Sequence, residues 1–75
     1  MSEYKITFTW DNESAMWIAT SDDVLGLVLE HGSFDALLER VRVAVPELLE
    51  LDGVGNSDVF LNFAAARQER LIYNG

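Results

Sequence analysis

The order of hydrophobic and polar residues predicts a strand near the start of the chain. Residues 4–10 alternate strictly, with one side formed by Tyr4, Ile6, Phe8 and Trp10 and the other by Lys5, Thr7 and Thr9. Such alternation is typical of a strand with one buried face. The polar run 11–14 follows, so we expect a hairpin turn and then a second strand at 15–20, which is apolar on both faces.

A break after the second strand leads to a third strand and then to a helix. The turn-forming run 21–23, Ser-Asp-Asp, predicts the break. A third strand is expected at 24–30, where Gly26 marks a bulge or a point of close approach. Ser33 suits the N-cap of a helix, and Asp35 in the first turn suits the positive end of the helix dipole.

The predicted helix is amphipathic. At about 100° per residue, its apolar residues share one stripe, formed by Phe34, Leu37, Leu38, Val41, Ala44, Val45, Leu48 and Leu49. Pro46 lacks an N–H and its ring meets the Arg42 carbonyl, so a kink or a restarted turn is expected there. The pairs Asp52-Gly53 and Gly55-Asn56 are expected to end the helix and turn the chain back.

A fourth strand is predicted at 58–65, where apolar residues again alternate, and residues 69–75 are expected to add a short fifth strand or to stay mobile. Three hairpin-linked strands, a helix and a parallel strand reached by a right-handed crossover give the sheet order 3-2-1-4. The predicted fold is therefore a single α+β domain over 1–75. Its topology is β-β-β-α-β, with a mixed four-stranded sheet and one helix on one face.

One face of this sheet is expected to stay uncovered. The helix stripe is expected to cover the face that bears Ile6, Phe8, Leu61 and Phe63, which leaves Trp17, Ala19, Val28 and Phe60 on the other. An uncovered apolar face marks an interaction surface. Trp17 and Phe60 are therefore candidate anchors for a partner. If the helix covers Met16 and Ile18, Trp17 lies on the open face.

The composition favours protein partners over nucleic acid. The 75 residues include no cysteine, and thirteen acidic against five basic side chains give a net charge of −8. This charge repels phosphates and attracts basic proteins. So small a domain buries only about 60% of its unfolded surface, which favours self-association. Residues 1–3 lack the positive region of a signal peptide and no apolar run spans a membrane, so a cytoplasmic protein is expected.

No residue pattern predicts chemistry. Asp22 and Asp23 are expected to point to opposite sides of an extended segment and so not to share a metal. His31, Ser33 and Asp35 resemble a catalytic triad only superficially, because the N-cap role accounts for Ser33. A nuclease of the same sheet order needs clustered carboxylates, and the first strand has none. We therefore expect no enzyme activity, metal or cofactor.

The segment 17–27, WIATSDDVLGL, with the helix cap that follows it, resembles the HicB-like antitoxin family and its close relatives of unassigned function. The matching positions are Trp17, Ala19, Ser21, Asp22, Asp23, Gly26, Leu27, Ser33, Leu37, Leu38, Leu48 and Leu49. Leu25 departs from the pattern, since many members have proline before the glycine. The helix segment 45–51, VPELLEL, fits the relatives of unassigned function better. Family antitoxins usually continue into a DNA-binding domain, and none is expected here.

The resemblance implies a degraded RNase H-like fold without nuclease activity, a homo-oligomer, and binding to a small basic ribonuclease toxin. A dimer is the expected oligomer. An acidic body that binds a basic partner is also reasonable on electrostatic grounds. Asp22, Asp23 and Glu30, beside the candidate face, are then expected to speed association with that toxin. The alternative is a stand-alone homo-oligomeric structural or small-ligand-binding module without a toxin partner.

Overall fold

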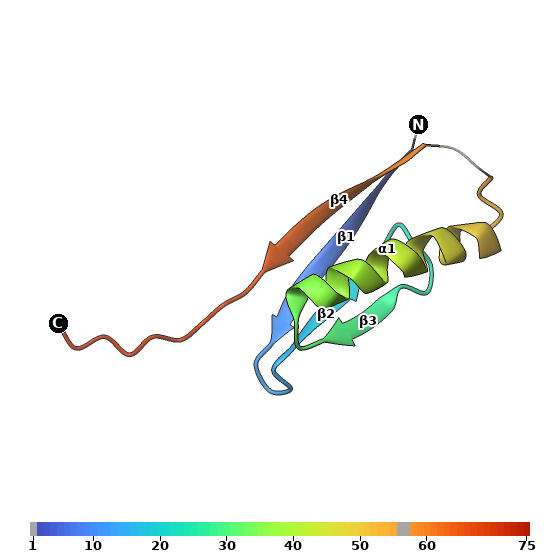
Figure 1. Cartoon of the computed structure of the whole chain (residues 1–75). Coiled ribbons are helices and arrows are strands. Elements are labelled where there is room, and N and C mark those ends of the chain that lie inside the picture. The colour runs from blue at the N-terminus through green and yellow to red at the C-terminus, as the bar shows by residue number, and fades with distance from the viewer. Residues whose placement is uncertain (1, 56–57) are drawn as a thin grey trace.

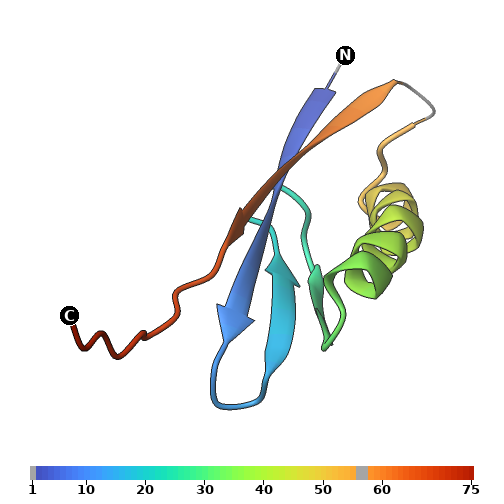
Figure 2. The ribbon, with the colours of Figure 1, turned by 60° about the vertical axis from the view of Figure 1, so that its left-hand side comes forward.

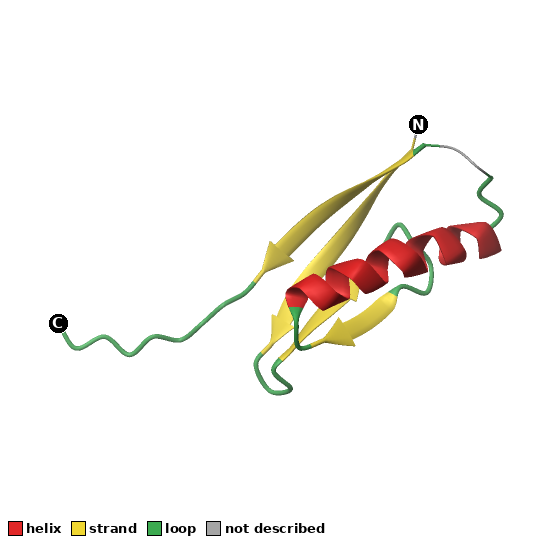
Figure 3. Cartoon of the chain, viewed as in Figure 1, coloured by secondary structure: helices red, strands yellow, loops and turns green. Residues whose placement is uncertain are grey.

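The computed structural model describes residues 2–55 and 58–75, and it contains four strands and one helix in the predicted order (Figures 1 and 3). The elements are β1 (Ser2–Asp11), β2 (Met16–Thr20), β3 (Val28–His31), α1 (Phe34–Leu51) and β4 (Val59–Ala66). The sheet order is β3-β2-β1-β4, with β1–β2 and β2–β3 antiparallel and β1–β4 parallel. The predicted α+β class and sheet order are confirmed.

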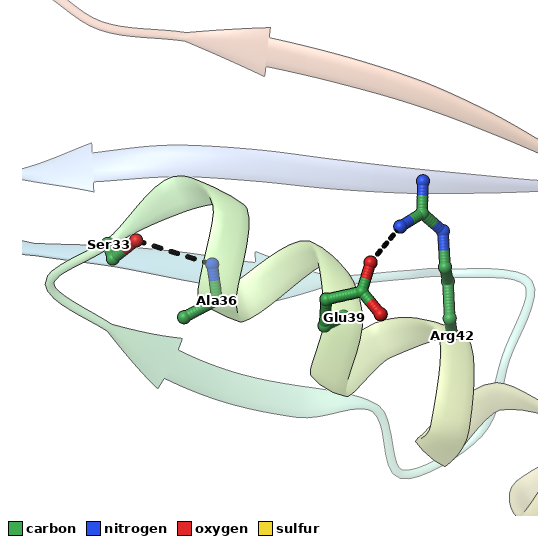
Figure 4. Close-up of polar contacts among 4 residues, drawn as sticks. All are labelled: Ser33, Ala36, Glu39 and Arg42. Carbon is green, nitrogen blue, oxygen red and sulfur yellow. Dashed lines mark hydrogen bonds and ion pairs between the residues drawn. The ribbon is translucent and has the colours of Figure 1, made fainter.

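The amphipathic stripe of α1 packs on the sheet. The Ser33 hydroxyl accepts a hydrogen bond from the Ala36 N–H at 3.3 Å, which is the predicted N-cap (Figure 4). The helix buries a row spaced by one turn, formed by Leu37, Val41, Val45 and Leu49. A restarted turn at Pro46 was the wrong expectation, because α1 runs through to Leu51 without a break. Pro46 has no N–H to donate to the Arg42 carbonyl. Both residues are exposed, so water can bind this carbonyl instead.

The helix ends in the αL turn expected at Asp52-Gly53. Gly53 has φ +80°, its N–H donates to the Glu50 carbonyl at 3.0 Å, and the Val54 N–H donates to the Leu49 carbonyl at 2.9 Å. These two bonds define a Schellman motif, which satisfies carbonyls that the helix end leaves free. The second half of the expected stop includes Asn56, which lies outside the described residues.

The third strand is shorter than expected. β3 begins at Val28, and residues 21–27 form a turn in which Gly26 has φ +82°. Val24 and Leu27 are nevertheless core residues, with 0% and 3% of their surface exposed. These two residues are apolar because the loop is buried in the core with α1, and not because they pair in the sheet. The apolar pattern therefore predicted a strand that was too long.

Trp17 and Ala19 lie on the face that the helix covers, contrary to expectation. Residue pairing places Ala19 opposite Phe8, and both are fully buried. The Trp17 ring contacts the ring of Phe34, the first residue of α1, with centroids 5.1 Å apart. Because paired residues in a sheet share a face, the register Phe8–Ala19 directs both β2 side chains toward the core. The open face instead carries Met16 and Ile18, with Val28 and Phe60 as expected.

The helix covers the sheet unevenly. The α1 backbone lies close to β3 and β2, and β4 runs along the far side of β1 (Figure 2). Phe63 points to the helix side of the sheet and its ring contacts Phe8, yet 43% of its surface is exposed. Among the described residues, 67–75 form no strand and extend away from the body (Figure 1). The expected fifth strand is therefore not formed within the single chain.

A glycine at position 15 is expected to stabilise the fold. Ala15, in the β1–β2 turn, has φ 54°, and the left-handed region costs a non-glycine residue roughly 1–2 kcal/mol. Glycine avoids this cost but loses more chain entropy on folding. The net effect of Ala15→Gly should be to raise the free energy of unfolding by about 0.5–1 kcal/mol. Urea unfolding followed by tryptophan fluorescence measures this change. Ala36→Gly inside α1 is the control and should lower stability by about 1 kcal/mol.

Candidate protein-binding surfaces

The residues predicted to bind a partner lie on three separate parts of the molecule. Trp17 is half-buried beneath the start of α1, where its ring also contacts the Trp10 ring. Phe60 is 47% exposed on β4, at one edge of the sheet. Glu30 is exposed on β3, the opposite edge strand, and Asp22 and Asp23 are exposed on the turn that connects β2 to β3. A single site that includes Trp17 and Phe60 is therefore not formed within one chain.

The turn that opens with Ser21 has a structural role. The Ser21 hydroxyl donates to the Lys5 carbonyl at 2.7 Å and accepts from the N–H groups of Asp23 and Val24 at 3.0 and 3.1 Å. The Asp23 carboxylate accepts from the Lys5 N–H at 2.7 Å. Pairing of β1 with β2 stops at Thr7–Thr20. The side chains of Ser21 and Asp23 therefore form the hydrogen bonds to the Lys5 backbone that a longer β2 would otherwise form. Asp23 is therefore engaged by the fold, and Asp22 is the carboxylate that points to solvent.

Four exposed side chains of β3 and of the turn before it, two of them acidic and two apolar, form a set that we call the β3 rim. It consists of Asp22, Leu25, Val28 and Glu30. Leu25 and Val28 are each 71% exposed, and both acidic residues are exposed as well. Val28 and Glu30 share the open face of the sheet, and Val28 pairs with Thr20 at the start of the turn. Sequence reasoning treated Leu25 only as a departure from a family pattern and did not identify it as an exposed apolar residue.

The acidic charge on this surface is largely uncompensated. Of the thirteen acidic side chains, Glu39 forms an ion pair with Arg42 (Figure 4) and Glu69 with Arg67 at 2.9 Å. The other acidic side chains meet no cationic group among residues 2–55 and 58–75. Both Asp22 and Glu30 belong to this group, so the β3 rim combines uncompensated negative charge with exposed apolar surface.

Two members of the superficial triad near the helix start, His31 and Ser33, form hydrogen bonds that cap this end of the helix. The His31 Nδ1 atom accepts a hydrogen bond from the Ser33 N–H at 2.9 Å, and the Ser33 hydroxyl caps α1 through the Ala36 N–H. No hydrogen bond joins the two side chains in the described part of the chain. Within that part, no three metal-ligating side chains cluster. No helix there is long and apolar enough to cross a membrane.

An open hollow of about 340 Å³ lies between the β1–β2 turn and the tail. Its lining residues are Asn12, Gln68, Glu69 and Arg70, all of which are exposed. Ligand pockets usually enclose most of the ligand within apolar walls and a few polar groups. This hollow is open and its lining residues are exposed, so it offers little support for the small-ligand alternative.

Comparisons with known proteins give a fold and a family without a function. The chain is similar to the crystal structure of hypothetical protein TTHA1013 from the extremely thermophilic bacterium Thermus thermophilus. The two are 39% identical with a TM-score of 0.77, over 95% of this chain and 99% of that chain. No curated protein shows detectable similarity. The family model for DUF1902, a domain of unknown function, matches residues 3–74. The chain therefore belongs to the DUF1902 family, a group without an assigned function, which is the coarser part of what its sequence predicted.

Proposed function

We propose that this chain is a non-enzymatic protein-binding domain that acts as a HicB-like antitoxin and neutralises a small basic ribonuclease. The observation that carries the proposal is the β3 rim, where Leu25, Val28, Asp22 and Glu30 are all exposed on β3 and the turn before it. Apolar contact area with a charged border is typical of a protein interface. The negative border selects a partner of positive charge, because complementary charge steers encounter and disfavours acidic partners.

The resemblance of segment 17–27 to HicB-like antitoxins supports the choice of partner. The side chains of Ser21 and Asp23 hold the turn to β1, so the shared Ser-Asp-Asp pattern has a structural reason and favours a common fold. The capping bonds of His31 and Ser33 support the non-enzymatic part of the proposal, because they account for both side chains without any substrate.

Co-purification with a neighbouring gene product tests this function. The chain is co-expressed with a small basic protein encoded next to it, and cleavage of RNA by that protein is measured with and without the chain. A stoichiometric complex that blocks RNA cleavage is the expected result. The proposal fails if the chain by itself shifts operator DNA, or if it cleaves RNA with added Mg²⁺ after rigorous purification. It also fails if the basic protein remains active in its presence.

Charge reversal at the β3 rim is expected to slow binding to the basic partner. Asp22→Lys combined with Glu30→Lys should lower the association rate constant at low salt by about tenfold or more, since steering of this kind changes on-rates by factors of 10–10³. The effect should nearly vanish at about 0.5 M salt, because salt screens exposed charges. The screening distance, the Debye length, is roughly 8 Å at physiological ionic strength and becomes shorter as salt is added. Stopped-flow measurements over a salt series give both values.

The matched control is Glu47→Lys combined with Glu50→Lys, which makes the same charge change on exposed positions near the end of α1. It should slow association less than the β3 rim variant at every salt concentration. Equal slowing by the two variants would show that only total charge matters and would contradict binding at the β3 rim. Asp23 is left unchanged in both variants because its carboxylate holds the Lys5 N–H.

The alternative function is a stand-alone homo-oligomeric module without a toxin. The exposed apolar surface of β4 and the projecting tail favour it, because both are suited to contact with another chain. The absence of any small basic reading frame beside the gene, together with pull-downs that recover only copies of the chain, would favour this alternative over the antitoxin.

A further inference from the structure

The outer edge of β4 is unprotected. β4 lies at the end of the sheet and contains eight residues, VFLNFAAA, without a charge or a proline. Natural edge strands usually carry Lys, Pro, a bulge or a cover, because their free N–H and C=O groups otherwise recruit other strands. The other edge strand, β3, is only four residues long and lies close to α1. The β4 edge is therefore the part of the sheet most suited to receive another strand.

Among the described residues, no strand of the same chain pairs with the segment that follows β4. Pairing of β1 with β4 ends at Thr9–Ala66, and β1 itself ends at Asp11. Residues 67–75, which we call the arm, continue past the end of the sheet (Figure 1). The tip of the arm carries Leu71, Ile72 and Tyr73, which are 85%, 75% and 82% exposed. Three consecutive apolar side chains are thus held in solvent.

The base of the arm is fixed to the body. The Arg67 guanidinium lies 3.9 Å from the centre of the Trp10 ring, and the Asn12 side-chain amide donates to the Gln68 carbonyl at 3.5 Å. Trp10 in turn donates to Asn12 at 2.9 Å. The arm extends outward from this base and its tip is exposed, so the geometry suits a segment that reaches a different molecule.

The arm and the β4 edge match in length and sequence. β4 spans eight residues, 59–66, and residues 67–74 of the arm span eight more. In a two-fold antiparallel pairing centred on Ala66, each arm would lie along the β4 edge of the other copy. This register sets Tyr73 opposite Val59, Ile72 opposite Phe60 and Leu71 opposite Leu61, so every large apolar residue of the arm meets one of β4.

The symmetric register centred one residue further along fits less well. A shift that centres the pairing on Arg67 would set this residue opposite its own copy and Ile72 opposite Asn62. Like charges directly opposite each other in a sheet are destabilising. In the register centred on Ala66, Arg67 meets Ala65 and Arg70 meets Asn62, so no like charges face each other.

The charge distribution also favours contact between the arm and a second body. Arg67, Glu69 and Arg70 give the arm a side-chain charge of +1, which leaves −9 on the rest of a chain whose total is −8. Two bodies of this charge repel each other at long range, and an arm with a slight positive charge is the segment that approaches the other body at the least electrostatic cost.

We propose that two copies of this chain exchange their arms, so that residues 67–74 of each copy form a fifth strand on the β4 edge of the other. The sheet of each copy then has the order β3-β2-β1-β4-arm, with the arm supplied by the partner. This exchange covers the unprotected edge and buries the apolar tip, and it uses neither the β3 rim nor a toxin.

A cysteine pair tests the contact and its register. The chain has no native cysteine, so Leu61→Cys combined with Leu71→Cys introduces the sole two thiols. Cα atoms of directly opposed antiparallel residues lie about 4.5–5.5 Å apart, within the range for a disulfide. Within one chain the ten-residue extended span between these positions is roughly 33 Å. Oxidised glutathione should therefore give a covalent dimer on a non-reducing gel. Leu61→Cys with Asn74→Cys is the register control and should stay largely monomeric.

Substitution of the arm tip tests its energetic role. Leu71→Asp combined with Ile72→Asp should raise the dimer dissociation constant in sedimentation by at least about 30-fold, as loss of an interface hot spot does. Both side chains are exposed in the single chain, so its fold should be unaffected, as unchanged circular dichroism would show. Leu25→Asp with Val43→Asp makes the same change at exposed positions outside the arm and should leave dimerisation unchanged.

Two results would overturn the arm exchange. The first is a wild-type chain that remains monomeric at about 100 μM, well above typical specific dissociation constants. The second is a dimer that the arm-tip substitutions do not weaken, which would place the contact outside the arm. Neither measurement involves a toxin, so a failure of the arm exchange and a failure of the proposed antitoxin role are distinguishable.

Discussion

Replacing Leu37 by alanine is expected to lower the free energy of unfolding by about 2–5 kcal/mol, the usual range for a buried leucine that leaves a cavity. The Leu37 side chain is 0% exposed and belongs to the row of α1 that packs on the core. A domain of this size has a total stability of roughly 4–11 kcal/mol. The variant should therefore be partly unfolded at room temperature, or unfold at a much lower urea concentration.

Leu51→Ala provides the matched control for this experiment. Leu51 lies on the same helix and loses the same atoms, but it is 83% exposed. Its replacement should change stability by less than about 0.5 kcal/mol, as is usual for surface positions. Urea unfolding of both variants at one protein concentration measures the difference. Equal midpoints for the two variants would contradict the packing of α1 on the sheet.

Removal of the Ser21 hydroxyl is expected to destabilise the fold by about 2 kcal/mol, within the range for polar groups left without a partner. This oxygen serves three backbone groups, the Lys5 carbonyl and the N–H groups of Asp23 and Val24. Val24 is fully buried, so its N–H has poor access to water when the hydroxyl is lost. Ser21→Ala should therefore lower the urea midpoint and speed hydrogen exchange at the Val24 amide.

Asp22→Ala is the control for Ser21→Ala. It removes an exposed side chain from the same turn and should change stability by less than about 0.5 kcal/mol. A similar loss in both variants would mean that the stability of the turn does not depend specifically on the bonds of Ser21. The same comparison matters for the antitoxin proposal, because it shows which carboxylates of this turn can be altered without loss of the fold.

Several elements follow from local sequence because their causes are local. The alternation in residues 4–10 predicted β1, and the apolar stripe after Ser33 predicted α1 with its N-cap. The sheet order followed from element order and connection rules, since three hairpin-linked strands and one crossover leave few arrangements. Asp52 and Gly53 were sufficient to predict the helix end, because the αL turn depends on a residue without a side chain.

Other features depended on contacts between distant residues. Residues 15–20 are apolar on both faces, so their sequence gives no preference for either face, and pairing of Ala19 with Phe8 decided that Trp17 lies toward the helix. The role of Asp23 rests on a bond to Lys5, which is 18 positions away in the sequence. For the same reason, no local pattern distinguished Asp22 from Asp23.

The sequence alone determined the strands, the helix, its cap and the acidic charge, since these depend on residue type and spacing. Only the tertiary structure decided which apolar residues remain exposed. The α1 backbone lies over β2 and β3, and this placement leaves Phe63 and the outer edge of β4 uncovered. Because β1 ends at Asp11, the arm continues past the strand that β4 pairs with, and its tip at 71–73 stays exposed. The length of one strand and the position of one helix thus define the surfaces that a second chain can use.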